Sequence, residues 1–258
     1  MPTGAITQYI DVAQIALYAF WIFFAALVIY LRREDKREGY PLESDRSSSV
    51  KVQGWPAMPE EKTYLLRDGS TRVTPRAPEP AGELRATPTG KWLGAPLEPD
   101  GNPMLDGVGP GAYAMRPDVP DRTVDNQDKI VPLRVATDFK VEARDPDPRG
   151  MPVVGADGAT GGIVRDVWVD RSEAILRYFE VEVPVAGGAR RVLLPVNFTK
   201  VDGGRGQVNV RSILGAQFAA VPGLAHPDRV TLLEEDRITA YYGAGQLYAE
   251  PSRLGPLV

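Results

Sequence analysis

The hydrophobic residues of this chain are unevenly distributed, and the first pattern they form is one long apolar run. Residues 12–31 contain a single side chain, Gln14, outside the apolar and aromatic set. At a rise of about 1.5 Å per residue, a helix of this length covers roughly the 30 Å hydrocarbon core of a bilayer. Because the bilayer centre offers no other hydrogen-bond partners, the backbone groups that cross it must bond to one another within a helix. The pattern predicts a transmembrane helix over residues 12–31, preceded by a short N-terminal segment of residues 1–11.

Basic residues follow the apolar run directly, and they set the predicted topology. They are Arg32, Arg33, Lys36 and Arg37, whereas residues 1–31 contain no Lys or Arg. The positive-inside rule places residues 32–258 in the cytoplasm and the N-terminus on the periplasmic side. A cleaved signal peptide would need basic residues before the apolar run and small residues after it, a pattern that this chain lacks. We expect the basic side chains to contact anionic membrane lipids, at about 1 kcal/mol each; the alternative is that they only fix the topology.

The second part of the chain, residues 32–130, is rich in Pro and Gly. The whole chain has 24 Pro and 26 Gly, and those in this part exclude a long helix. Residues 62–75 predict a β-hairpin, with short apolar runs on both sides of an Asp68-Gly69 turn. A disordered linker would lack the large side chains that are spaced along this part. They are Trp55, Tyr64, Trp92, Met104 and Tyr113. We therefore predict an extended cytoplasmic segment that packs on partner subunits.

Beyond residue 130 the pattern changes to short β-branched runs separated by turn residues. Over residues 131–258 this spacing predicts a small antiparallel β-barrel or sheet. Along residues 175–183, alternate positions fall on opposite faces and place Arg177 on the largely apolar one. Residues 232–249 predict a C-terminal helix with an acidic triplet in its first turn, which suits the helix dipole, and with Gly243 or Gly245 at its end. The predicted fold class is a single transmembrane helix plus a mainly-β domain with a C-terminal helix and a long extended segment.

Charge and composition exclude several functions. The chain has 30 Lys and Arg against 34 Asp and Glu, a net charge of −4, so it lacks the basic excess that nucleic-acid binding requires. It has no Cys and one His, which excludes a cysteine nucleophile and argues against a zinc or His-based catalytic centre. No G-x-S-x-G, P-loop, G-x-G-x-x-G or H-E-x-x-H motif is present. These absences favour a protein without catalytic activity of its own.

The densest group of ionisable residues surrounds a predicted turn between two strands. It comprises Asp166, Asp170, Arg171, Glu173 and Arg177. Two of the carboxylates could serve as the acid and base of a hydrolase, which requires their pKa values to be pushed apart. Glu173 and Arg177 could instead form an ordinary ion pair, which would contribute about 0–1 kcal/mol to stability. In a third interpretation the carboxylates relay protons, for which pKa values near the working pH are needed.

Several longer motifs point to a known family. In chain order they are LRREDKREGYPLE, GNPMLDGVGPGAY, KIVPLRVA, DPRGMPVVGADG, VWVDRSE, RYFEVEV and LLEEDRITAYYGAGQLYA. In these motifs and in their order, from the first residues to about residue 250, the chain resembles the H subunit of the purple-bacterial photosynthetic reaction centre. The resemblance implies one transmembrane helix and a cytoplasmic β-barrel of the PRC type, in agreement with the pattern above.

The resemblance also implies a function, partners and a location. An H subunit is non-catalytic, caps the cytoplasmic face of the L and M subunits, and supports proton delivery to the secondary quinone. It binds no cofactor alone; bacteriochlorophyll, bacteriopheophytin, quinones and non-haem iron are expected in L and M. Light-harvesting antenna and a cytochrome subunit are further expected partners, and the expected location is the bacterial inner photosynthetic membrane. From the residues alone, a single-pass β-barrel adaptor that binds a cytoplasmic protein stays an alternative.

The resemblance assigns roles to individual residues. Glu173, in the family's VDxxE turn, maps onto the proton route below the quinone, Arg177 maps onto its neighbour, and Asp170 is a weaker match. Some family members take up protons at two His just before the KI of a KIxP segment, where this chain reads TVDNQDKIVPL. We expect Asp125 and Asp128 to collect protons in their place; the alternative is that both are solvated loop carboxylates.

Overall fold

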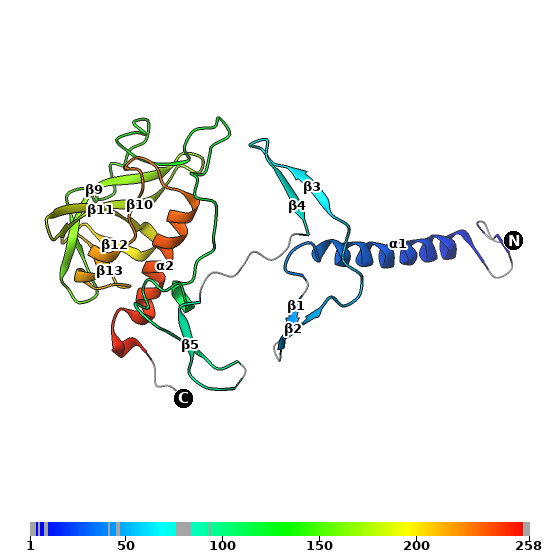
Figure 1. Cartoon of the computed structure of the whole chain (residues 1–258). Helices are drawn as coiled ribbons and strands as arrows, with labels where there is room; N and C mark the ends of the chain where they lie inside the picture. The colour runs from blue at the N-terminus through cyan, green and yellow to red at the C-terminus, as the bar shows by residue number, and fades with distance from the viewer. Residues whose placement is uncertain are drawn as a thin grey trace. The chain divides into compact units, whose positions relative to one another are not determined.

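The apolar run at the N-terminus folds as helix α1 (Val12–Asp35), drawn in blue in Figure 1. The helix begins after Asp11, whose Oδ1 accepts a hydrogen bond from the Gln14 N–H at 2.7 Å and caps the first turn. It ends four residues beyond the predicted residue 31, with Arg32 and Arg33 in the last turn, where cations interact favourably with the helix dipole. Among the described helices, α1 alone is long and apolar enough to cross a membrane, and none of its side chains is buried.

Two compact units make up the part of the chain that the computed structural model describes, namely residues 4, 6–7, 10–40, 42–44, 47–75, 84–92 and 94–254. The first unit contains the chain up to residue 83 together with Gly90–Ala95, and the second contains Leu84–Thr89 and the chain from Pro96 onward. The predicted division after residue 130 therefore lies inside the second unit. Met104, a predicted partner anchor, is instead buried in the core of that unit. Residues 76–83 of the predicted extended segment lie outside the described residues.

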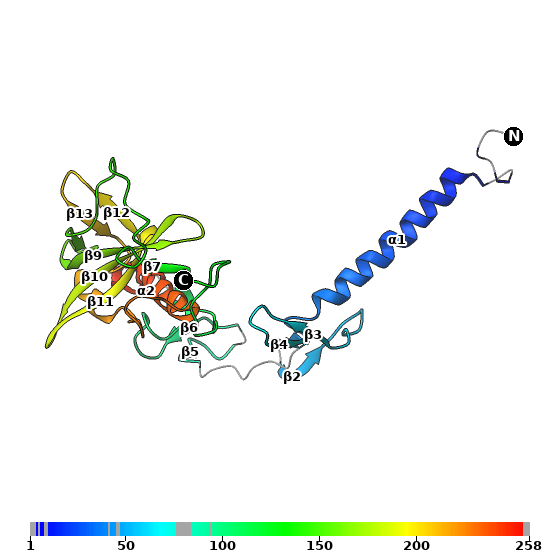
Figure 2. The ribbon, with the colours of Figure 1, turned by 90° about the horizontal axis from the view of Figure 1, so that it is seen from above.

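Two β-hairpins follow α1 in the first unit. They are formed by β1 (Leu42–Ser44) with β2 (Ser47–Val52) and by β3 (Lys62–Leu65) with β4 (Thr71–Thr74). The predicted turn at Asp68-Gly69 is confirmed. Gly69 has a φ of 81°, a left-handed conformation that Gly adopts without steric cost, and Asp68 Oδ1 accepts the Ser70 N–H at 2.9 Å. Both views show these hairpins at the C-terminal end of α1 (Figures 1 and 2).

A seven-stranded sheet forms the centre of the second unit. Its strands are β7 (Ile130–Pro132), β8 (Pro152–Val154), β9 (Thr160–Asp170), β10 (Ile175–Val185), β11 (Gly188–Pro195), β12 (Thr199–Asp202) and β13 (Gln207–Val210). Their order is β11-β10-β9-β8-β13-β12, with β7 paired to β9. The pairs are antiparallel except β13 with β8, which is parallel. Because β11 and β12 each have one neighbouring strand, the described sheet stays open and does not close into a barrel.

Short elements flank this sheet. They are the strand pair β5 (Ala86–Pro88) and β6 (Leu97–Pro99) and the 3-10 helices η1 (Gly109–Gly111), η2 (Val196–Phe198), η3 (Gly215–Ala220) and η4 (Pro251–Arg253). The predicted C-terminal helix is confirmed as α2 (Leu232–Tyr248). Its start is fixed by a capping box in which Thr231 and Glu234 each accept the backbone N–H of the other, at 3.1 and 2.8 Å.

Helix α2 shares one hydrophobic core with the sheet. Tyr242 of α2 is fully buried, and its ring stacks on Phe198 with the ring centroids 5.7 Å apart and meets Phe218 at 6.2 Å. Trp168 of β9 is also fully buried in this core. A buried aromatic side chain removes about 150–250 Å² from water, so these rings contribute much of the stability that joins α2 to the strands.

Strand β10 departs from the strict alternation that the sequence predicts. Residues Tyr178 to Val181 are buried consecutively, whereas Arg177 is exposed. Irregularities in the pairing with β9, between Leu176 and Tyr178 and between Glu180 and Val181, change which side chains face the core. The prediction that Arg177 lies on the apolar face is therefore wrong.

The glycines predicted to end α2 lie inside it, and the prediction is wrong for a packing reason. The helix continues through Gly243 and Gly245 to Tyr248. A Cβ on Gly245 would lie 2.4 Å from Ile213 Cγ2 and 2.5 Å from the Ser212 carbonyl oxygen. Gly245 therefore permits the close approach of a neighbouring segment rather than terminating the helix.

The substitution Gly245→Ala should destabilise the second unit, although Ala favours a helix over Gly by about 1 kcal/mol. Overpacking costs about 1–3 kcal/mol, so we expect a net loss of about 1 kcal/mol or more in the free energy of unfolding, measured by thermal unfolding of the full chain. The matched control is Gly243→Ala, whose Cβ would meet only the Pro110 carbonyl oxygen, at 3.0 Å. Equal effects of the two substitutions would contradict the packing argument.

Candidate functional site

The turn between β9 and β10 carries two of the predicted site residues, Asp170 and Glu173. Asp170 is buried at the end of β9, and its Oδ1 accepts hydrogen bonds from the N–H of Ser172 at 2.9 Å and of Glu173 at 3.1 Å. Ala174 follows with a φ of 54°, a left-handed conformation that costs a residue with a side chain about 1 kcal/mol. The Asp170 carboxylate thus shapes the turn, and the turn holds the Glu173 side chain at the surface, 54% exposed.

Three carboxylates surround the Lys129 ammonium at this turn. Its Nζ lies 3.4 Å from Oδ2 of Asp170, 3.5 Å from Oδ2 of Asp121 and 3.7 Å from Oε1 of Glu173. The pairing of Ile130 with Asp170 brings Lys129 to this place, because β7 lies antiparallel to the end of β9. We call Asp121, Lys129, Asp170 and Glu173 the acid cluster. Three carboxylates around one ammonium leave the acid cluster with a net negative charge.

The charge state of Lys129 is fixed by its neighbours. Burial by itself would lower the pKa of Lys129, but the negative charges of Asp170 and Asp121 outweigh burial and raise the pKa. The ammonium therefore stays protonated at neutral pH and keeps the carboxylates together.

Asp128 and Asp125 lie in the loop beside the acid cluster. Asp128 directly precedes Lys129 and pairs with Arg122 at 2.9 Å, so its charge already has a cationic partner. Asp125 is exposed and, with Arg171, lines a surface pocket of about 480 Å³. The Arg171 Nη1 donates to the Asp128 carbonyl oxygen at 3.4 Å, which joins this loop to the β9–β10 turn. The role of both residues as proton collectors stays a prediction.

Glu235, on the first turn of α2, is a buried carboxylate next to the acid cluster. Its Oε2 accepts a hydrogen bond from the Tyr178 hydroxyl at 2.7 Å. Burial raises the pKa of Glu235; the Tyr178 hydrogen bond and the positive charge of Arg177 act in the opposite direction without cancelling the shift. The negative charge of Asp121 raises this pKa further. Asp121 therefore links the acid cluster electrostatically to a carboxyl group inside the domain.

Arg177 does not pair with Glu173. Among the described ion pairs the cation next to Glu173 is Lys129, and Arg177 instead acts on the pKa values of Glu235 and Tyr178. The interpretation of Glu173 and Arg177 as an ordinary ion pair is therefore wrong. The pairing of β7 with β9 brings Lys129 to Glu173, whereas the sequence pattern suggested Arg177 as the cation.

Asp166, which the sequence groups with the turn, belongs to a second charge network. It lies four residues before the end of β9, about 13 Å along the strand at 3.3 Å per residue. There it faces Glu180 of β10, and Arg134 Nη1 contacts both carboxylates, at 3.0 and 2.7 Å. Arg191 at 2.7 Å and Trp168 Nε1 at 3.0 Å complete the surroundings of Glu180. The prediction of one cluster that includes Asp166 is wrong because the strand separates it from the turn.

Lys129, Asp121, Glu235 and Tyr178 are site residues that the sequence does not single out. Lys129 and Asp121 are far from the turn along the chain and reach it only through the β7–β9 pairing. The sequence places Glu235 in the first turn of a helix, where a carboxylate suits the helix dipole. Its burial depends instead on the packing of α2, where Tyr178 of β10 contacts it. The one local signal was the Thr231-x-x-Glu234 capping box, which identifies the helix start but not the face that is buried.

Lys36 has no surface left for a lipid headgroup. It is 1% exposed, and its Nζ donates to the carbonyl oxygens of Gln53, at 2.6 Å, and of Pro56. The Tyr40 ring covers it, with the ammonium 5.2 Å from the ring centroid. Lys36 therefore joins residues 53–56 to the end of α1.

Of the other three basic residues after the apolar run, one makes contacts within the fold and two lie at the surface. Arg37 pairs with Glu34 at 2.8 Å and donates to the Thr74 carbonyl oxygen at 3.1 Å, so it fastens the β3–β4 hairpin to α1. Arg32 and Arg33 are exposed. The predicted lipid contact, which stays a prediction, is thus available to Arg32 and Arg33.

The two units together define a class of protein. A helix that can span a membrane is joined to a mainly-β domain, and among the described residues no group of three or more potential ligands could hold a metal ion. These features define a membrane-anchored protein with an open β-sheet domain and a surface rich in paired charges.

Comparison with protein families gives this class a narrower identity. Residues 4–135 match the family model of the photosynthetic reaction centre H-chain N-terminal region, and residues 140–216 match the PRC-barrel domain. Because the first match covers just over half of the chain, the chain belongs to the family of photosynthetic reaction centre H chains. The resemblance seen in the sequence is confirmed. A chain of this family is a structural subunit associated with a reaction centre complex, in agreement with an N-terminal membrane-anchoring helix.

The substitution Lys36→Met should loosen the first unit. It leaves the Gln53 and Pro56 carbonyl oxygens without their buried donor, which costs about 1–3 kcal/mol. We expect faster hydrogen exchange over residues 53–60 in the full chain in detergent, measured by mass spectrometry. The exposed Arg33→Gln is the charge-matched control and should leave exchange unchanged; equal acceleration in both variants would contradict the role given to Lys36.

The substitution Glu235→Gln should change stability in a pH-dependent way. The folded pKa of Glu235 lies above its usual 4.5, so the ionised carboxylate disfavours the folded state once the pH exceeds the unfolded value, and this cost is absent at lower pH. The amide keeps an acceptor for Tyr178 without the charge. The stability of the variant relative to the natural chain should therefore increase from about pH 4 to about pH 8, measured by thermal unfolding. The exposed Glu142→Gln should show no such trend, and a flat difference for Glu235→Gln would contradict its burial as a charge.

Proposed function

We propose that this chain caps the cytoplasmic face of the L and M subunits of a photosynthetic reaction centre and supports proton delivery to the secondary quinone. The observation that carries the proposal is the acid cluster, in which carboxylates pass from 54% exposed at Glu173 to 1% exposed at Asp170 around one ammonium. The proposal rests further on membership of the H-chain family.

The capping role is supported by large side chains that the chain itself leaves uncovered. Trp55 is 75% exposed, Leu65 76% and Trp92 65%, all in the first unit. Tyr64 of the β3–β4 hairpin is also exposed. Large apolar side chains exposed in this number favour a surface that another protein covers. Subunits L and M are the proposed cover, in a permanent interface of the obligate kind.

The proton-delivery role follows from what quinone reduction requires. A doubly reduced quinone takes up two protons from the cytoplasm while the protein around it excludes bulk water. A series of carboxylates and ordered waters reconciles these demands, because each carboxylate can hold a proton in turn. Glu173 and Asp121 would take up protons at the surface, and Asp170 and the high-pKa Glu235 would hold charge or protons further inside. Asp125 and Asp128 are proposed as collectors beside them, and Arg177 as the cation that adjusts the pKa of Glu235.

Topology, location and cofactors complete the proposal. The N-terminus would be periplasmic and the bulk of the chain cytoplasmic in a bacterial inner photosynthetic membrane, in accordance with the basic residues after α1. L and M would hold the bacteriochlorophyll, bacteriopheophytin, quinones and non-haem iron. Antenna and a cytochrome subunit are further proposed partners, and lipids would contact Arg32 and Arg33.

In the intact complex, Glu173→Gln should slow the second electron transfer to the quinone and its coupled proton uptake. We expect a loss of roughly tenfold, below the 10²–10⁴ typical of a sole acid–base group, because other carboxylates of the acid cluster provide parallel routes. Primary charge separation should be unchanged, and Glu142→Gln serves as the control. Flash-induced absorption and pH-indicator kinetics measure both steps; unchanged second-flash kinetics would remove Glu173 from the mechanism.

The near-infrared absorption of the native complex separates capping from the adaptor alternative. The complex would be isolated from photosynthetically grown membranes through a tag on the C-terminus of this chain. Bacteriochlorophyll and bacteriopheophytin bands with reversible light-induced bleaching are the expected result. A colourless preparation from pigmented membranes would instead favour an adaptor for a cytoplasmic protein.

A further inference from the structure

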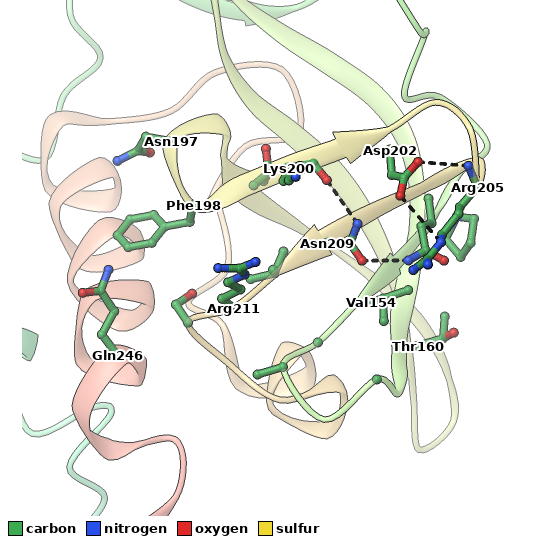
Figure 3. A pocket seen from close by; sticks show the side chains of 18 of the residues that line it. Val154, Thr160, Asn197, Phe198, Lys200, Asp202, Arg205, Asn209, Arg211 and Gln246 are labelled. Atoms are coloured by element: carbon green, nitrogen blue, oxygen red, sulfur yellow. Dashed lines mark hydrogen bonds and ion pairs between the residues drawn. The ribbon is translucent and has the colours of Figure 1, made fainter. Parts of the chain in front are cut away.

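A groove of about 1190 Å³ opens in the second unit, away from every residue of the acid cluster. It lies between the β12–β13 hairpin, strand β8 and helix α2 (Figure 3). Lys200 comes from β12, Arg211 follows β13, and Gln246 projects from α2 on the other side. The groove therefore combines side chains from separate elements, which the fold holds at fixed positions.

The charge of this groove is opposite to that of the chain. The chain has a net charge of −4, whereas the groove is lined by Lys200, Arg205, Arg211 and Arg253 against Asp202 as its one carboxylate. Arg253 is bound internally, at 2.7 Å from the Gly245 carbonyl oxygen and at 3.2 Å from Glu250, and Arg205 lies 3.9 Å from Asp202. Lys200 and Arg211 are exposed and have no carboxylate within ion-pair distance in the described part of the chain.

The uncharged lining adds hydrogen-bonding capacity to these cations. Amide side chains at Asn197, Gln207, Asn209 and Gln246 line the groove, and Gln207 Nε2 already donates to Asn209 Oδ1 at 2.7 Å. Ser212, also in the lining, is 5% exposed, and its hydroxyl has no hydrogen-bond partner among the described residues. A lining of amides, cations and an unpartnered hydroxyl favours a ligand with many acceptor oxygens.

The size and the lining of the groove point to one kind of ligand. Its volume exceeds the roughly 300–1000 Å³ of small-molecule pockets, and a single phosphate or headgroup would leave most of it empty. The sheet contributes one face to the lining, with Val154 of β8, Asn209 of β13 and Lys200 of β12 side by side, and the amide side chains can both donate to and accept from the backbone of an extended segment. We propose that this groove binds an extended acidic polypeptide segment of a partner subunit, with Lys200 and Arg211 pairing its carboxylates and the amide side chains bonding its backbone.

This inference goes beyond the proposed function, since neither capping by the first unit nor proton delivery by the acid cluster uses the groove. A direct test measures binding of a fluorescein-labelled decapeptide of alternating Glu and Thr to the full chain in detergent by fluorescence anisotropy. The double variant Lys200→Gln/Arg211→Gln should weaken binding about tenfold, equivalent to about 1.4 kcal/mol. The conservative double variant Lys200→Arg/Arg211→Lys keeps both charges and should retain binding, and thermal unfolding of both variants checks that they fold.

Matched controls separate groove binding from general charge attraction. Lys140→Gln/Arg229→Gln removes the same charge at exposed positions outside the groove and should leave affinity unchanged, and a Gln-Thr decapeptide should not bind. Absence of saturable binding by the natural chain, or equal losses in both charge-removing variants, would overturn the proposal. Inorganic phosphate and phosphatidylglycerol vesicles are tested alongside; binding of either one that depends on Lys200 and Arg211, without binding of the Glu-Thr peptide, would overturn the peptide assignment.

Discussion

The antiparallel pairing of β9 with β10 is the constraint on which the arrangement of charge in the second unit depends. Its register sets Asp170 opposite Ile175 at the turn and Asp166 opposite Glu180 further along. Carboxylates that are close in sequence are thereby assigned to two sites with different surroundings. β7 then adds to β9 at Asp170 and brings Lys129 to the turn. Without this register, neither the acid cluster nor the network around Glu180 could form.

The two charge networks differ in how many cations each carboxylate contacts. Glu180 is 2% exposed and contacts Arg134 and Arg191, so its charge is fully paired. Breaking a buried pair of this kind typically costs about 3–5 kcal/mol, because the remaining charge has no partner. In the acid cluster three carboxylates share Lys129, and Glu173 is open to water. Two guanidinium groups thus hold Glu180 of β10, whereas one ammonium is shared among the three carboxylates of the acid cluster.

In the first unit, polar contacts attach the segments that follow α1 to the end of this helix. Lys36 and Arg37 donate hydrogen bonds to backbone carbonyl oxygens, and Arg37 also pairs with Glu34. These contacts attach residues 53–56 and the β3–β4 hairpin to the end of α1. Polar contacts hold this unit together, because few of its described apolar side chains are buried. Its large apolar side chains, Trp55 and Leu65 among them, stay exposed. These side chains give the unit its exposed apolar surface.

Elements whose signal is local could be predicted from the sequence. The length of an apolar run identifies α1, an Asp-Gly turn between β-branched runs identifies the β3–β4 hairpin, and apolar periodicity identifies α2. The motifs also identified the family, and Glu173 and Asp170 were placed correctly at one turn. The folded structure was needed to show which cation lies beside these carboxylates, which basic residue after α1 is buried, and why Gly245 is inside a helix. Burial, ion pairing and close backbone approach are relations between segments far apart in the chain, and a pattern along one segment carries no information about the partner that folding brings against it.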